Sequence, residues 1–239
     1  MELNQWLKSF QLKDNRLVGP FFYGTPLALR FEIGPADEAE ELSRGIYLER
    51  AYTRAVELFE QASSEYDYVL LSLLRQEDRD IDTYLWHFSS KFNFDKVPEP
   101  ELIEVEDLTG DVLVFERYLF PVTDQDLNAL LREIVKADHG GFNYLSSSVL
   151  FLSSQDNIIY HCYDDRGVDI AVLDDDKRLE LFTDCHDLLF DYDMEEMERR
   201  VRGRKPLLKV IYHLLDKSTS QVNTGSKKST VKPVENMVE

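Results

Sequence analysis

Apolar and polar residues alternate along residues 27–33, where Leu29 and Phe31 point to one side and Arg30 and Glu32 to the other. This period of two is that of a half-buried β-strand. Denser apolar runs are typical of strands that are buried on both faces. Together the two patterns predict strands at residues 27–33, 66–74, 112–120, 144–152, 157–163 and 168–173.

Elsewhere a helical period places apolar residues three and four positions apart. Thr123 is expected to cap a helix that Gly140 and Gly141 end, and Asp193 with Glu196 resembles a capping box that opens another. Residues 80–92 fit a helix less clearly than the others. The remaining predicted helices span residues 2–10, 38–63, 177–189 and 207–215.

The connections between the last three predicted strands are only four residues long, so we expect an antiparallel meander there. Residues 97–110 contain two prolines, five carboxylates and no cation, which predicts an acidic connecting loop. The whole pattern predicts an α/β (α+β) fold, with a mixed or antiparallel sheet covered by helices. We assign residues 1–203 to a single domain, residues 204–216 to a C-terminal helix, and residues 217–239 to a disordered tail.

Composition favours a folded chain without narrowing its chemistry. Hydrophobic residues make up 43% of the 239 positions and aromatic residues 12%, enough for one large domain with a sizeable core. The two cysteines, Cys162 and Cys185, form no disulfide framework, and the N-terminus lacks the pattern of an export signal. No apolar run approaches the roughly 18–20 residues that span a bilayer. We therefore expect a soluble, cytoplasmic protein that does not engage a membrane.

The charges are unevenly placed. Residues 1–198 hold 17 Lys/Arg against 43 Asp/Glu, a balance of −26, whereas residues 199–239 hold 10 against 3, a balance of +7. The acidic body disfavours nucleic acid and anionic membranes and favours encounter with a basic protein partner. The alternative is that the charge only keeps the protein soluble. The basic residues 199–205 lack interleaved aromatic residues, so we expect them to neutralise the acidic body rather than to bind nucleic acid.

The segment Tyr163-Asp164-Asp165-Arg166-Gly167 lies between two predicted strands and is either a hairpin turn or the centre of a polar site. Asp at the first position of a type I turn and Gly at the fourth account for Asp164 and Gly167, and the glycine can take the left-handed conformation. The turn does not account for Tyr163, Asp165 and Arg166, nor for the nearby Asp169. Any binding or catalytic role is therefore expected in these four residues.

Two further groups of polar residues have both a structural and a functional interpretation. Arg30 and Glu32 share a strand face, where they form either an ion pair or part of a site that Arg54 could reach. Asp191 and Asp193 flank Tyr192 and could hold a magnesium ion, although Asp193 is better explained as a helix cap.

Metal and cofactor motifs are weak in this chain. His161 and Cys162 are adjacent on a strand and point to opposite faces, and no CxxC or HxxxH pair is present. There is also no phosphate-binding glycine loop, no G-x-G-x-x-G and no G-x-S-x-G. We predict no metal and no cofactor, and we interpret Cys162 as a core thiol rather than a nucleophile.

These motifs carry a family resemblance. The stretches 22–26 and 29–34, the Arg54-Ala55 step, the central run Ile159 to Asp169 and the closing segment 188–193 resemble an uncharacterised bacterial family, the domain of unknown function 3885. The resemblance covers roughly residues 6–200 and implies a soluble bacterial α/β domain with no demonstrated catalysis. It also implies that certain residues meet around one polar centre: Arg30, Arg54, Asp164, Asp165, Arg166, Asp169 and Tyr192.

Three functional hypotheses remain open. The preferred one is a non-catalytic acidic protein-binding domain, with an immunity-type or antitoxin-type protein as the specific case. The alternative is a small-ligand-binding protein or enzyme that uses the Arg/Asp polar centre around residues 163–167. The third is a scaffold or oligomer subunit that docks through residues 207–215. The oligomeric state is left open.

Overall fold

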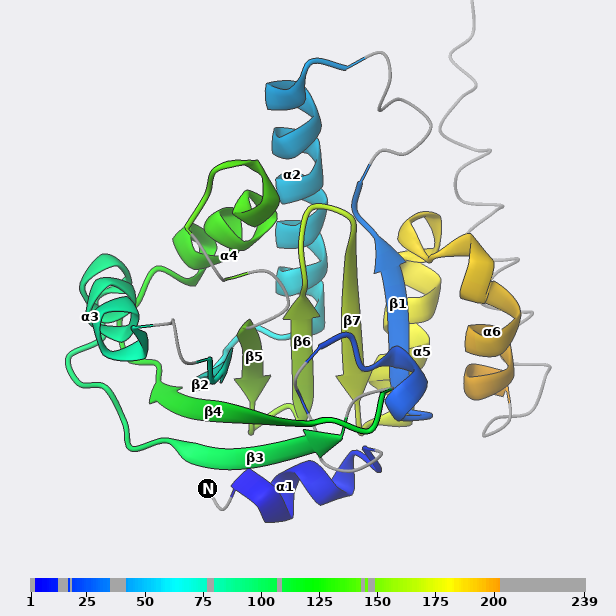
Figure 1. Cartoon of the computed structure of the whole chain (residues 1–239). Coiled ribbons are helices and arrows are strands. Elements are labelled where there is room, and N and C mark those ends of the chain that lie inside the picture. Colours follow the sequence, from blue (N-terminus) through cyan, green and yellow to red (C-terminus); the bar gives the residue numbers. More distant parts are fainter. Residues whose placement is uncertain are drawn as a thin grey trace, which may run out of the picture.

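The computed structural model describes residues 3–12, 17, 19–34, 42–76, 80–106, 109–142, 145 and 149–202. Its centre is a seven-stranded antiparallel sheet in the order β1-β7-β6-β5-β2-β4-β3 (Figure 1). The strands are β1 (Ala28–Glu32), β2 (Tyr68–Leu74), β3 (Glu101–Glu106), β4 (Val112–Pro121), β5 (Val149–Ser153), β6 (Ile158–Cys162) and β7 (Gly167–Val172). The single α+β domain and the β5-β6-β7 meander confirm the predicted fold class.

The helices surround this sheet, and short 3₁₀ turns join several of the elements. The α-helices are α1 (Leu3–Ser9), α2 (Arg44–Ala62), α3 (Ile81–Phe92), α4 (Leu127–Val135), α5 (Asp175–Asp184) and α6 (Met194–Arg202). The 3₁₀ turns are η2 (Phe22–Gly24), η4 (Ala137–His139), η5 (His186–Leu188) and η6 (Asp191–Asp193). In the described part, no helix combines the length and apolarity needed to cross a membrane.

One face of the sheet is covered by α2, α3 and α4, with α2 running behind β6 (Figure 1). On this face the Phe59 ring of α2 meets Phe151 and Tyr160 edge-on, with ring centroids 5.0 Å apart in both pairs. The Tyr160 hydroxyl donates to the Ala55 carbonyl oxygen at 2.7 Å. Farther along, Phe88 of α3 lies against a buried ring of β4. Aromatic rings therefore fill the layer between these helices and the sheet.

The N-terminal segment covers the opposite face. Trp6 of α1 donates to the Asn157 side chain at 3.2 Å, and the Ser72 hydroxyl of β2 donates to the Leu17 carbonyl at 3.2 Å. Phe21 stacks on His161 of β6, with ring centroids 5.8 Å apart. This face is therefore closed by residues from the start of the chain, which brings η2 next to β1 and β7.

The prediction of an acidic loop at residues 97–110 is wrong, because Glu101–Glu106 form the edge strand β3. An edge strand tolerates charged side chains on its solvent side, and the side chains of β3 alternate between half-buried and exposed. The cap expected at Thr123 is also wrong. Asp126 caps α4 instead, and its carboxylate accepts from the Ala129 N–H.

Several other predictions agree with the structure within a few residues. The uncertain helix at 80–92 is α3, which Asp80 caps by accepting from the Thr83 N–H. The long second helix begins at Arg44; residues 38–41, where its start was expected, lie outside the described residues. The helix and tail predicted beyond residue 203 also lie outside the described residues.

Candidate functional site

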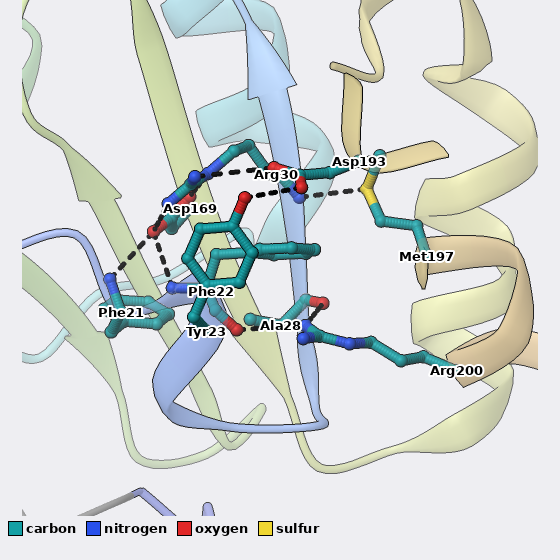
Figure 2. A network of polar contacts seen from close by, with 9 residues as sticks. All are labelled: Phe21, Phe22, Tyr23, Ala28, Arg30, Asp169, Asp193, Met197 and Arg200. Atoms are coloured by element: carbon teal, nitrogen blue, oxygen red, sulfur yellow. Dashed lines mark hydrogen bonds and ion pairs between the residues drawn. The ribbon is translucent and has the colours of Figure 1, made fainter. Parts of the chain in front are cut away.

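Arg30 and Asp169 form the centre of a buried polar network where β1 pairs with β7 (Figure 2). They are direct cross-strand partners, and the Arg30 Nε donates to Asp169 Oδ1 at 2.8 Å. Asp169 Oδ2 accepts from Arg30 Nη2 at 3.1 Å and from the backbone N–H groups of Phe21 and Phe22 at 2.8 Å each. The Asp169 carboxylate is fully buried, and four donors surround it. It therefore binds one cation and also orients the entry to η2.

Asp193 and Tyr23 extend this network toward the surface. The Tyr23 hydroxyl donates to Asp193 Oδ1 at 2.6 Å, and Arg30 Nη1 lies 3.5 Å from Asp193 Oδ2. The hydrogen bond to Asp193 raises the pKa of Tyr23. The carboxylate of Asp193, interpreted from the sequence as a helix cap, is instead bound by residues 163 and 170 positions away. No local sequence pattern could reveal these partners.

α6 contributes the third side of the network. The Met197 sulfur accepts from the Arg30 backbone N–H at 3.2 Å, and Arg200 donates to the carbonyl oxygens of Phe22 and Ala28 at 3.0 Å each. The Arg30 and Arg200 guanidinium carbons lie 4.9 and 4.0 Å from the centroid of the Phe22 ring, so two cations contact one aromatic side chain. Figure 2 shows how these contacts tie η2, β1, β7 and α6 together.

The polar groups of this network bind one another, and this limits the chemistry that they can perform. Burial lowers the pKa of Arg30, but the hydrogen bond and charge of Asp169 raise it by more, so the guanidinium stays charged. Burial, together with the charge of Asp169, raises the pKa of Tyr163 well above its ordinary value, so this phenol stays protonated and is a poor acid. The donors and acceptors at the centre are used by each other, as in a structural lock. The arrangement stabilises the domain rather than exposing a reactive group.

The turn between β6 and β7 is a second, separate cluster. Asp164 accepts from the Arg166 backbone N–H at 2.8 Å and from its Nε at 2.8 Å, which confirms the expected role of Asp164 in the turn. The Asp165 carboxylate lies 3.0 Å from Nε2 of His139. The Arg166 side chain is 73% exposed. The ion pair of Arg166 is therefore made within the turn and not with the carboxylates of the buried network.

The left-handed conformation expected at Gly167 is wrong. The glycine is needed there because the space beside it is filled by the Tyr163 side chain. The glycines with positive φ in the described part are Gly110 and Gly140. A Cβ at Gly167 would lie 2.0 Å from the Tyr163 hydroxyl oxygen and 2.6 Å from the ring carbon that bears it. The absence of a side chain at Gly167 therefore lets the Tyr163 ring lie across the turn.

The structure links only some of the residues expected in one polar centre. Tyr163 lies within electrostatic reach of both clusters, because its pKa responds to Asp169, Arg30 and Asp164. Arg54 donates to the Ile33 carbonyl oxygen at 3.3 Å. Tyr192 is 84% exposed, and its ring centroid lies 6.2 Å from that of Phe190. The residues therefore divide into a buried network, a turn and a surface aromatic pair.

One group of carboxylates in the described part has the spacing of a cation site. Oxygens of Asp138, Asp164 and Asp165 lie within 4.8 Å of one another. Arg166 and His139 already contact two of these carboxylates, which accounts for the cluster without a metal ion. At η6, Asp193 is engaged with Arg30 and Tyr23, so it is not free to hold magnesium together with Asp191. The chain is thus still predicted to bind no metal.

The environment of Tyr47 gives a testable pH dependence. Burial and the Asp165 carboxylate, which accepts from its hydroxyl, raise the pKa of Tyr47 to about 12 from an ordinary value of 10. The folded state holds this proton more tightly, so its contribution to stability is complete below pH 10 and is lost as the pH rises toward 12. In urea unfolding between pH 9.5 and 11.5, Tyr47→Phe should lose stability less steeply than the wild type. The exposed control Tyr192→Phe should follow the wild type, and equal slopes for all three proteins would contradict the assignment.

The fold and the network define the chain as an α+β domain, in which one antiparallel sheet is locked to its N-terminal segment by a buried Arg–Asp pair. The family model described as Domain of unknown function (DUF3885) matches residues 3–193, and the chain belongs to this family. No curated protein matches the chain. No solved structure matches it either.

Proposed function

We propose that this protein is a non-catalytic acidic domain of the bacterial cytosol that binds a basic protein partner, with an immunity-type or antitoxin-type role as the specific case. The observation that carries the proposal is the large excess of carboxylates over the Lys and Arg side chains that pair with them. In the described part of residues 1–198, eight Lys and Arg side chains already pair with carboxylates. Much of the balance of −26 over residues 1–198 lies on exposed carboxylates of the described residues.

A surface of this kind acts through its field as well as through contacts. Excess negative charge speeds the encounter with a cationic protein and penalises acidic competitors. Exposed carboxylates lie on different elements, among them Glu57 and Glu60 on α2 and Glu104 and Glu106 on β3. Because these are solvent-exposed, their contribution to binding is expected to weaken as salt rises.

The geometry gives less support to the enzyme or small-ligand alternative. Arg30 is engaged with Asp169 and Asp193, and Arg166 is engaged with Asp164, so the two arginines do not converge on a shared space. One open cavity of about 360 Å³ lies between residues 94–99 and 121–125. Another, of about 570 Å³, lies at the C-terminal end of α2, against residues 155–158 and 174–177. Neither cavity is lined by residues of the buried Arg30–Asp169 network or of the Asp164–Arg166 turn.

The test is a partner that can be purified and titrated. The full chain, immobilised, is used to capture proteins from a lysate of the native host at low and high salt, and each captured protein is then purified and titrated by calorimetry. We expect a basic partner of defined stoichiometry whose affinity falls with salt. A variant with Glu57, Glu60, Glu104 and Glu106 all changed to Gln should bind at least about fourfold more weakly, since each exposed pair contributes roughly 0.2–1 kcal/mol.

Two results would contradict the proposal. One is the recovery of no partner that binds again after purification. The other is a partner whose affinity is the same for the wild type and for the variant with four Gln substitutions. Circular dichroism of that variant serves as the control for folding, because the four side chains are exposed and their change should alter stability little.

A further inference from the structure

The free edge of the sheet has a chemistry that the proposed function does not specify. Among the described residues, β3 is the last strand and pairs only with β4. The other edge strand, β1, is closed by a bridge between Phe31 and Leu189 and by the hydrogen bond from the Phe190 N–H to the Arg30 carbonyl. Alternate residues of β3 direct their backbone N–H and C=O groups away from β4, as in any edge strand.

The end of the β3–β4 ribbon also presents a mixed apolar and acidic face. Leu102 is 57% exposed and Val112 is 60% exposed. Because Glu106 is paired with Val112 and Glu104 with Val114, these side chains share one face of the ribbon. The same face carries α3 farther along β4, but α3 contacts buried rings such as Phe120 there. We call the face formed by Leu102, Glu104, Glu106, Val112 and Val114 the ribbon face.

From this juxtaposition we infer that β3 accepts an extended basic segment of the protein partner as an eighth strand. Main-chain hydrogen bonds to the free edge would supply affinity, and side chains on alternate positions would supply specificity. Cationic residues of the added strand would lie opposite Glu104 and Glu106 on the ribbon face. Apolar residues would lie opposite Ile103 and Val105, which are half-buried on the other face. The inference rests on the proposed function, because it names the surface and the kind of segment that the acidic domain binds.

Charge complementarity selects this occupant over a second copy of the chain. Pairing β3 of one molecule with β3 of another would bring carboxylates to face an acidic strand, and like charges across strands are destabilising. Protective edge strands commonly carry lysine, whereas β3 holds three glutamates and no cation. Among the described residues, Arg75 lies near the ribbon face, where it pairs with Glu116 at 3.5 Å. The ribbon face thus keeps Glu104 and Glu106 for a partner.

The test uses a labelled peptide of alternating lysine and valine, Lys-Val-Lys-Val-Lys-Val-Lys, with Lys-Lys-Val-Val-Val-Lys-Lys as a control of the same composition. Fluorescence anisotropy with the full chain should show that the alternating peptide binds more tightly than the control. The variant E104Q/E106Q should bind it about tenfold more weakly, because two cross-strand charge pairs are lost. The matched control D187N/E195Q, at exposed positions of η5 and α6, should bind it nearly as the wild type does.

Residue-level hydrogen exchange locates the peptide. Backbone amides of Glu101–Glu106 should gain protection when the alternating peptide is added. Absence of binding, or equal weakening by the two double variants without protection of β3, would overturn the inference. In the latter case, a salt-sensitive basic partner found in lysate would still support the proposed function.

The alternative occupant of the β3 edge is the basic C-terminal segment of the same chain. If β3 amides are protected before any peptide is added, and the substitutions K227Q, K228Q and K232Q remove that protection, the edge is occupied by residues of the same chain. That result would overturn the inference of a partner strand. If protection appears only with the peptide, in both the wild type and this Lys-to-Gln variant, the partner strand is supported.

Discussion

Replacing Asp169 with alanine is expected to lower the free energy of unfolding by about 3–5 kcal/mol, the cost of breaking a buried ion pair by removing one partner. Arg30 would keep its charge, with Asp193, at 3.5 Å, as its remaining carboxylate partner in the described part. The backbone N–H groups of Phe21 and Phe22 would lose their acceptor at the same time. Urea unfolding followed by circular dichroism measures the change.

The matched control is Asp187→Ala, which removes an exposed aspartate from η5. We expect a change within about 0.5 kcal/mol, as for most surface substitutions. If Asp169→Ala does not fold, Asp169→Asn serves instead, because the amide oxygen can still accept from the backbone N–H groups. A loss no larger than that of Asp187→Ala would show that the network does not stabilise the domain.

A double-mutant cycle separates the ion pair from the backbone contacts. Arg30→Met and Asp169→Ala together should cost less than the sum of the two single changes, because neither charge is left unpaired. The remaining loss reports the two N–H groups that Asp169 orients at η2. The cycle therefore assigns part of the stability to strand pairing and part to anchoring of the N-terminal segment.

The strands were predictable because their signal is local. The alternation at residues 27–33 correctly placed Arg30 on the polar side of β1, and four-residue connections correctly indicated the meander of β5, β6 and β7. β3 was missed because its glutamates and flanking prolines are typical of a loop. An edge strand exposes one side to water, so its composition differs little from that of a polar connection.

The candidate site was predictable only where its partners are close in sequence. Asp164 and Arg166 are two residues apart, and turn chemistry correctly anticipated the hydrogen bond from the Arg166 N–H. Asp169 was singled out as a residue that the turn leaves unexplained, but its backbone partners lie 147 and 148 positions away. Side-chain roles that depend on tertiary packing of this kind cannot be derived from spacing along the chain.

Gly167 and Tyr163 provide the second large effect, because the turn depends on their close contact. Gly167→Ala is expected to destabilise the domain by about 1–3 kcal/mol, the usual cost of forcing extra volume into a packed site. The new methyl group would meet the Tyr163 side chain, whose three nearest atoms lie between 2.0 and 3.0 Å from the added Cβ position. The unfolding free energy of each protein is measured in urea.

The same substitution in a Tyr163→Ala background distinguishes crowding from backbone strain. If the Tyr163 ring causes the cost, Gly167→Ala should be nearly neutral once the ring is removed, and the coupling energy should approach the cost of the single change. If a left-handed backbone caused it, alanine at Gly167 would cost the same in both backgrounds. Because the backbone of Gly167 does not have positive φ, we expect strong coupling. An additive cycle would show that Gly167 is selected for a reason other than the Tyr163 ring.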